Sequence, residues 1–426
     1  ITGAAGNLGT ANLEGAIGGT LIDDKLMGRI SFLSQNRDDW VDNSFRNEND
    51  AMGGFETAAF RGQLLWTPTE DLDVLFLAQH FDLDGNAGPI FRANVLSQGS
   101  NELNRNYDRD RVAQDGLGNN AAFMKIDGYT IKLDWNLGDH TLTSISSYQR
   151  VYDRGGRSDI DGGFGCLFTC EGPAGPPSDP FTPFASPFVV NVETGSTQDL
   201  DQFTQEFRLA SNYDGRLNYQ VGFFYFYDDF EGSGFEQSAG ATTFAETSRS
   251  RIENTAWAVF GQGTYDLSDA LKLTVGLRYS DDQKEAVVSR VTGGVVEPFP
   301  AFDLEDDHLS WDVALSWFFD DSNQVYAKAA SGFRAPTIQD RLVDDPDVST
   351  ADSETILSFE IGYKALWERT RLNTAIYYYE VDDMQLTAVG GADNSTRLLN
   401  ADAGIGYGAE LEIEYLATDN LVFTGG

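Results

Sequence analysis

The chain has no long hydrophobic run. None of its segments approaches the ~18–20 consecutive apolar residues of a transmembrane helix, although 41% of its 426 residues are hydrophobic. This absence argues against helical membrane spans. It does not argue against membrane-spanning strands, because such a strand places its lipid-facing side chains at every second position.

Cysteine and histidine are scarce, with two Cys and three His in the whole chain. Cys166 and Cys170 lie four positions apart, whereas His80, His140 and His308 are far from them. A structural metal site needs about four ligands, so we predict no metal site. A local disulfide in an oxidising compartment explains the pair better, with two free thiols as the alternative.

Basic residues are also few, with 29 Lys and Arg against 67 Asp and Glu and a net charge of -38. This balance excludes nucleic acid as the expected partner, since nucleic-acid binding needs a basic surface. A solvated acidic surface is the simplest interpretation of the charge. A surface that concentrates calcium or other cations is the alternative.

Motifs of enzymes are missing as well. The sequence contains no phosphate-binding P-loop, no HExxH, no GxSxG and no zinc-ligand spacing. Glycine-rich segments occur at 15–19 and 161–165, but neither stands between a strand and a helix. We therefore predict no enzyme, no catalytic residues and no cofactor.

What the chain does have is a regular alternation of two kinds of connection. Short polar turns and long polar loops follow one another along the chain, separated by runs of about ten residues with period-two alternation. Tight turns at one end of every hairpin and long loops at the other end are typical of outer-membrane β-barrels. The short turns are Ile22–Lys25, Pro68–Asp71, Leu137–His140, Asn212–Gly215, Leu267–Asp269, Asp320–Asn323, Trp367–Thr370 and Ala417–Asn420. The long loops are Asn36–Phe55, Phe81–Ala122, Tyr152–Gln202, Asp228–Asn254, Ser280–His308, Phe333–Thr355 and Val381–Gly404.

The strands have one apolar and one polar face. A clear example has Leu271, Leu273, Val275, Leu277 and Tyr279 on one face. In a soluble sandwich or small barrel this face points inward, and in a large membrane barrel it points to lipid. The sorting of turns and loops by end favours the membrane barrel. We predict an all-β, large antiparallel up-and-down transmembrane barrel, and eight turns with two strands each predict about 16 strands.

The segment that follows the strand Val325–Ala329 resembles the TonB-dependent outer-membrane receptors. These commonly carry a Gly-Phe-Arg-Ala-Pro-type segment, which here is Gly332, Phe333, Arg334, Ala335, Pro336 and Thr337. Further stretches are similar to the same family in order and spacing, namely Leu13–Gly19, Ser353–Thr355, Phe359–Lys364, Asn400 and Gly404–Glu410.

The resemblance implies a 22-stranded barrel filled by an N-terminal plug domain. The match begins inside the barrel, so we expect residues 1–426 to be the receptor's β-barrel domain, truncated at both ends and without the plug and TonB box. It also implies the outer membrane of a Gram-negative bacterium, outer-membrane lipid and TonB as partners, and TonB-energised uptake of a scarce ligand. A ferric siderophore is the commonest ligand class in the family, with cobalamin, haem and oligosaccharides open. A passive porin-like channel is the first alternative, and a secreted all-β binding module is the second.

The side-chain parity of the motif strand places Arg334. It shares the even positions of Gln324 and Lys328, so we expect it in the lumen at the outer rim, whereas Phe333 takes the lipid side with Val325. Two roles are open for Arg334. It could brace a neighbouring strand or loop through a carboxylate, or it could contact an anionic ligand.

We predict that Cys166 and Cys170 form a disulfide within an outer loop. The ring is small, so its contribution to the free energy of unfolding is expected to stay at or below the ~3 kcal/mol of a 15-residue loop. Thiol labelling of the unfolded protein, with and without reductant, measures the bond. Labelling without reductant would contradict it.

Overall fold

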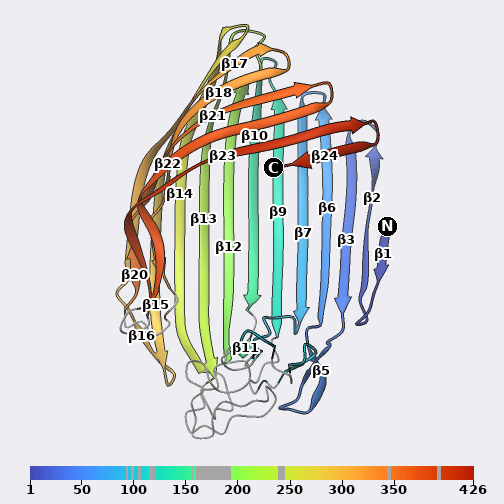
Figure 1. Ribbon diagram of the computed structural model, residues 1–426, viewed down its shortest axis with the longest axis vertical. Coiled ribbons are helices and arrows are strands. Elements are labelled where there is room, and N and C mark those ends of the chain that lie inside the picture. The colour runs from blue at the N-terminus through green and yellow to red at the C-terminus, as the bar shows by residue number, and fades with distance from the viewer. Residues whose placement is uncertain are drawn as a thin grey trace.

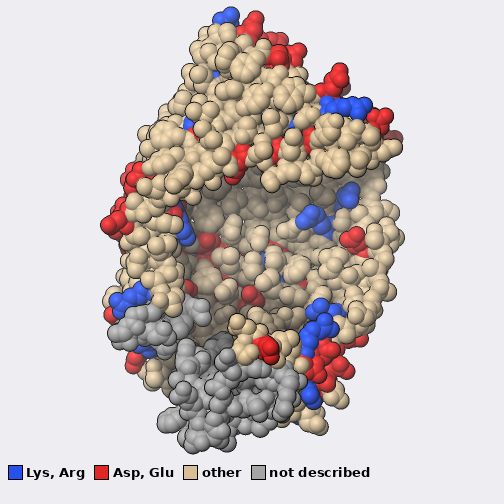
Figure 2. All heavy atoms as spheres, in the orientation of Figure 1, with Lys and Arg blue, Asp and Glu red and all other residues tan. Residues whose placement is uncertain are grey.

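The protein is built from antiparallel β-strands wrapped around a hollow (Figures 1 and 2). The computed structural model describes residues 1–92, 95–96, 100–103, 107–112, 114, 121–155, 157–159, 193–237, 245–340, 342, 347–390 and 395–426. Among these residues, no helix is long and apolar enough to cross a membrane.

Eight hairpins supply the sixteen strands that the turns predict, and all of them except the 5-residue β24 are long. Their bounds are β2 Ala11–Ile22, β3 Leu26–Arg37, β6 Phe55–Thr69, β7 Leu72–Gly85, β9 Ala122–Asn136, β10 His140–Arg154, β12 Glu193–Ser211, β13 Leu217–Gln237, β14 Ala245–Ser268, β15 Leu271–Thr292, β17 Phe302–Asp320, β18 Asn323–Arg334, β21 Glu354–Trp367, β22 Thr370–Gly390, β23 Ser395–Thr418 and β24 Leu421–Gly425. The short strands are β1 Thr2–Ala5, β4 Val41–Asn43, β5 Glu48–Met52, β8 Arg111–Val112, β11 Ser158–Asp159, β16 Val295–Pro298, β19 Thr337–Gln339 and β20 Ser349–Ala351.

The main sheet has 19 strands. In it, β11 and β16 are short side branches, and each of the others pairs antiparallel with its neighbours along the chain, from β1 to β24. Two smaller sheets lie at the loop end, β5-β4-β8 and β19-β20. We call the loop end of the barrel the mouth.

All eight predicted short turns are confirmed. Their local chemistry explains why the chain can reverse in so few residues. Asp24 adopts a positive φ of 55°, Gly138 adopts 79°, and the Lys25 amide donates to the Ile22 carbonyl at 3.0 Å. Asp, Asn and Gly tolerate this left-handed backbone better than other residues do.

The long loops are shorter than predicted, because the strands continue into them. β13 reaches Gln237 and β14 begins at Ala245, whereas the sequence suggested a loop over Asp228–Asn254. Likewise, β15 and β17 extend through most of Ser280–His308. The polar residues in these stretches lie in regular strand pairs that continue beyond the apolar zone. Polar composition alone therefore predicted strand ends that are too early in the hairpins.

The apolar sets face outward, as the membrane prediction requires. Val275, Leu277 and Tyr279 are exposed on β15, and their direct cross-strand partners Val313, Trp311 and Leu309 belong to the same outer face. Large aromatic side chains mark both ends of this face. Near the tight turns they are Trp66, Trp135, Tyr265, Trp317, Trp367 and Tyr415, and towards the mouth they are Phe60, Tyr129, Tyr148, Phe203, Trp257 and Tyr279.

The two aromatic rows lie at the two ends of the apolar zone. Phe60 and Trp66 stand six residues apart on β6, and Trp257 and Tyr265 stand eight apart on β14. At ~3.3 Å per residue these intervals span about 20–26 Å along the strand. A strand tilt of about 40° reduces this to about 15–20 Å along the membrane normal, within the ~25 Å apolar band of outer-membrane barrels.

Ion pairs begin on the outer face immediately above the upper aromatic row. Arg150 pairs with Asp199 at 2.7 Å, and Lys125 pairs with Asp82 at 3.4 Å. Such exposed pairs contribute little stability each, but they show where the wall leaves the apolar zone.

Glycines inside the strands allow aromatic rings to lie flat across the neighbouring strand. Gly406 is the direct partner of Tyr379, and a Cβ at this glycine would lie 2.2 Å from the Tyr379 ring. Gly362 stands in the same relation to Tyr326, at 2.5 Å. These close approaches explain why glycine occurs at strand positions where it would otherwise weaken the sheet.

We predict that Gly406→Ala lowers the free energy of unfolding by about 1–3 kcal/mol, because the new Cβ overlaps a packed ring. Gly62→Ala is the matched control, since a Cβ at Gly62 meets nothing within 4 Å. Urea unfolding of the refolded protein in lipid vesicles measures both variants. Equal stability of the two would contradict the packing argument.

Candidate functional site

The motif segment, Gly332–Thr337, leaves the wall at the mouth and folds against the lumenal side of the barrel. β18 pairs with β17 only as far as Ala330, and its pairing with β21 ends at the Arg334–Glu354 pair. Beyond that pair, the Lys284 ammonium lies 3.2 Å from the Thr337 hydroxyl. Lys284 belongs to the even, lumenal positions of β15, opposite in parity to its lipid-facing residues. The segment therefore lines the lumen.

Hydrophobic packing holds the same segment against the wall. Ile338 is 9% exposed and packs on Ala286 and Val288, which lie in the lumenal set of β15. The Ser250 hydroxyl of β14 donates to the Asp340 carboxylate at 3.0 Å. A cavity of about 240 Å³ remains between segment and wall, lined by Phe226, Asn254, Asp282, Lys284, Ala335 and Pro336.

Phe333 packs on an aromatic ring of the neighbouring strand β17. Its ring stacks on His308 with 4.8 Å between centroids, and His308 pairs opposite Ser280 in the lumenal set of β17 and β15. β18 has separated from β17 beyond Ala330, whereas its register with β21 continues to Arg334.

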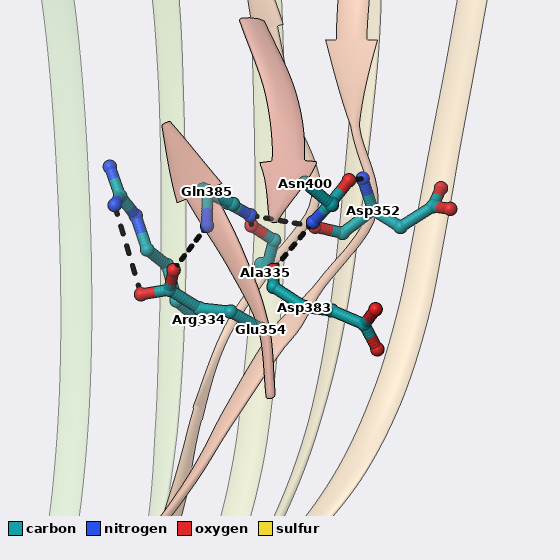
Figure 3. Close-up of polar contacts among 7 residues, drawn as sticks. All are labelled: Arg334, Ala335, Asp352, Glu354, Asp383, Gln385 and Asn400. Atoms are coloured by element: carbon teal, nitrogen blue, oxygen red, sulfur yellow. Dashed lines mark hydrogen bonds and ion pairs between the residues drawn. The ribbon is translucent and has the colours of Figure 1, made fainter. Parts of the chain in front are cut away.

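The motif segment begins the loop that joins β18 to β21, which we call the motif loop. Two side-chain amides hold the ends of this loop against β22 and β23 (Figure 3). The Gln385 side-chain nitrogen donates to the carbonyls of Ala335 and Asp352, both at 2.9 Å. The Asn400 side chain accepts from the Asp352 amide at 2.8 Å and donates to the Asp352 carbonyl at 2.9 Å. Gln385 and Asn400 are direct cross-strand partners, so one rung of the sheet holds both ends of the loop.

Arg334 lies beside this clamp and pairs with Glu354, its direct partner in register. The guanidinium and carboxylate are 3.8 Å apart, and the Arg334 side chain is 62% exposed. The Gln385 backbone amide donates to the same carboxylate at 2.6 Å, which fixes Glu354 (Figure 3). The contacts of Arg334 therefore match the role of bracing the neighbouring strand β21, through a weak and exposed ion pair with Glu354.

A second structured element stands at the mouth, formed by the loops on either side of β6 and β7. Strands β4, β5 and β8 form a small sheet around Val41, Met52 and Val112, of which Val41 and Met52 are fully buried. The buried Asn43 side chain donates to the Gln114 carbonyl at 2.8 Å. Local sequence gave no sign of this packing, because its partners lie about 70 residues apart.

Cys166 and Cys170 lie outside the described residues, so their disulfide stays a prediction. Within the described part of the chain, no group of three or more His, Cys, Asp or Glu could hold a metal ion. Gln385 was not singled out by the sequence. Asn400 was noted only through the family resemblance. Gln385 is its direct cross-strand partner, so the pairing of β22 with β23 would have pointed to it.

The sequence profile described as "TonB dependent receptor-like, beta-barrel" matches residues 23–425. The chain belongs to this family. The fold and the family are those of transport receptors, not of enzymes, and the up-and-down transmembrane barrel predicted from the sequence is confirmed.

Solved structures show the same fold in siderophore receptors. The ferric yersiniabactin uptake receptor FyuA from Yersinia pestis aligns with a TM-score of 0.75 at 16% identity, covering 98% of this chain and 58% of its own. The ferric-catecholate import receptor Fiu from K12 E. coli aligns at 0.71 and 12%, covering 98% and 62%. The siderophore receptor PiuA from Acinetobacter baumannii aligns at 0.68 and 14%, covering 99% and 63%. The chain spans about three fifths of the length of these receptors.

We predict that Asn400→Ala loosens the motif loop. The substitution leaves the Asp352 amide without its side-chain partner and the Asp352 carbonyl with Gln385 alone, which costs about 1–3 kcal/mol locally. Hydrogen exchange of the Asp352 amide should then quicken roughly ten- to hundredfold. Asn373→Ala is the control, because its amide makes one long 3.4 Å bond to Glu412. Unchanged exchange at Asp352 would show that the clamp does not hold the loop.

Proposed function

We propose that this barrel is the wall of an outer-membrane receptor of a Gram-negative bacterium, and that the receptor takes up a ferric siderophore with energy from TonB. The membership of the chain in the receptor family carries the proposal. FyuA, Fiu and PiuA are receptors for ferric yersiniabactin, ferric catecholates and siderophores, and this similarity supports the ligand class.

The difference between the two ends of the barrel supports the proposal that the receptor captures its ligand outside the cell. The tight turns all lie at one end, and the two small sheets and the motif loop all lie at the other. Variable loops on a rigid scaffold are where binding residues usually occur. We propose that the mouth is the ligand-binding end and that the opposite end faces the periplasm.

The wall itself has no means of moving a ligand uphill. The sequence carries no nucleotide-binding motif, and the outer membrane is not supplied with ATP. The force must come from another protein, and in this family TonB supplies it through the plug. We therefore propose TonB, a plug domain and outer-membrane lipid as partners.

Arg334 is proposed as a bracing residue of the mouth and not as a ligand contact. Its guanidinium already has a carboxylate partner, and an exposed pair of this kind contributes no more than about 1 kcal/mol. Arg334→Gln is expected to leave ligand affinity within about twofold. A tenfold or larger loss of affinity, measured by titration of the refolded receptor with a ferric siderophore, would assign the residue to the ligand instead.

We predict that cells expressing the full-length receptor grow on its ferric siderophore only when TonB is present. Uptake of the radiolabelled iron complex measures transport, and surface binding at low temperature measures capture. Binding should persist without TonB while uptake stops. Uptake that continues in cells lacking TonB would overturn energy coupling and favour a passive porin-like channel.

A further inference from the structure

A shallow apolar groove crosses the outer face of the barrel between β10 and β15. Its volume is about 630 Å³, and the residues that line it include Leu142, Phe207, Leu209, Val221, Val259 and Gly261. Register places all of these on the lipid side, and exposed Leu277 of β15 is the direct partner of Gly261. The strands involved lie inside the sheet, away from the edge strands β1 and β24 (Figure 1). The groove therefore opens outward, towards lipid, and not into the lumen.

A glycine forms the floor of the groove, and a second glycine extends it towards the tight turns. Gly261 and Gly263 occupy successive outward positions on β14, opposite Val221 and Tyr219 of β13. A Cβ at Gly261 would meet the Val221 side chain at 3.4 Å, which is an ordinary contact. Packing within the protein therefore does not require glycine at this position, in contrast to Gly406. What glycine provides here is an open strip on the surface that faces lipid.

A polar cluster lies at the tight-turn end of the groove. His140 and Tyr219 are the next outward residues after Leu142 and Val221, which line the groove. The His140 Nε2 atom lies 3.0 Å from the Tyr219 hydroxyl and 2.9 Å from the Tyr213 hydroxyl. Tyrosine is common at membrane interfaces, but this preference does not explain a histidine joined to two tyrosines. The cluster gives the apolar groove one polar end.

The cluster keeps a proton for an outside acceptor in either tautomer of His140. A neutral imidazole donates from one nitrogen and accepts at the other. If Nε2 accepts a hydroxyl proton, the N–H of Nδ1 is left, and Nδ1 has no partner among the described residues. If Nε2 donates, a tyrosine hydroxyl hydrogen is left. Tyr213 is 37% exposed, so a phosphate oxygen of a lipid can approach the cluster.

The two tight turns beside the cluster carry charges of both signs. Asp139 lies in the first turn, Asp214 lies in the second, and Arg216 follows the second turn. The Asn212 amide donates to the Asp139 carbonyl at 2.7 Å, which joins the two turns. All three charged side chains are exposed, and none forms an ion pair with a described residue. This end of the groove thus offers donors for a phosphate and carboxylates for a cation.

We propose that the groove and the cluster bind one phospholipid of the periplasmic leaflet, whose headgroup carries both a phosphate and an ammonium. The phosphate accepts from His140 and the two tyrosines, and the ammonium is held by Asp139 and Asp214. An acyl chain fills the groove, because the groove lies in the apolar zone, where hydrocarbon surrounds the barrel. From Gly263 to Val259 the groove follows β14 for about 13 Å at ~3.3 Å per residue. The choice of leaflet rests on the orientation given in the proposed function, whereas the site itself does not.

Lipid titration of the full-length receptor tests the site. The receptor is stripped of lipid in detergent, and native mass spectrometry measures its binding of phosphatidylethanolamine and phosphatidylglycerol with identical acyl chains. One phosphatidylethanolamine should bind roughly tenfold more tightly than phosphatidylglycerol. Y213F/Y219F removes both hydroxyls and keeps both rings, and it should weaken phosphatidylethanolamine roughly tenfold. G261L fills the floor of the groove and should weaken both lipids. D139N/D214N should remove the preference between them.

Matched variants separate the site from general effects on the lipid-facing surface. Y265F/Y415F removes two hydroxyls from exposed tyrosines of the lower aromatic row. G19L adds a side chain on the outer face of β2, where a Cβ meets nothing within 4 Å. Both should bind lipid like the parent, and circular dichroism checks the folding of every variant.

Four results would overturn the proposal. They are a parent that retains no lipid, a parent that binds the two lipids equally, a site variant, Y213F/Y219F or G261L, that binds like its control, and a second copy of the receptor bound in place of lipid. None of these readouts depends on TonB or on a siderophore, so the uptake proposal stands or falls separately.

Discussion

Backbone hydrogen bonding between adjacent strands is the constraint on which the rest of this structure depends. Within a lipid bilayer no water is available to satisfy an amide or a carbonyl, so each strand must pair with its neighbours along the whole apolar zone. The meander meets this demand with short turns at one end. Because pairing fixes the register, it also fixes which side chains meet lipid and which meet the lumen.

The same constraint explains the mouth. Above the aromatic row the outer face meets water, and strands can leave the sheet without an unsatisfied backbone. β18 separates from β17 after Ala330 there, and the chain that follows is held by other means. Gln385 and Asn400 supply the hydrogen bonds that a neighbouring strand would otherwise supply, and Ile338 supplies the apolar contact.

Much of the barrel could be predicted from local sequence, because period two and turn chemistry are local properties. The turns at Ile22–Lys25 and Leu137–His140 follow from a few Asp and Gly residues, and the outward set of β15 follows from alternation. The limits of β13 and β14 could not be found in this way, since a solvent-exposed strand and a loop have the same polar composition. The Gln385 clamp joins residues 50 and 33 positions apart, a distance over which no local pattern is informative.

Net charge is a poor guide to the chemistry of a wall with two faces. The value of -38 sums acidic residues on outer strands, on turns and on the lumenal side of β23, and it conceals the lumenal arginines Arg29 of β3 and Arg61 of β6. What a lipid or a neighbouring segment of protein meets is the local set of side chains within about a Debye length, roughly 8–10 Å at moderate salt. Register decides that local set, because moving a strand by one residue would exchange Arg29 and Arg61 with lipid-facing Ile30 and Phe60. The pairing that satisfies the backbone in the membrane thus also determines which charges lie on each face of the wall.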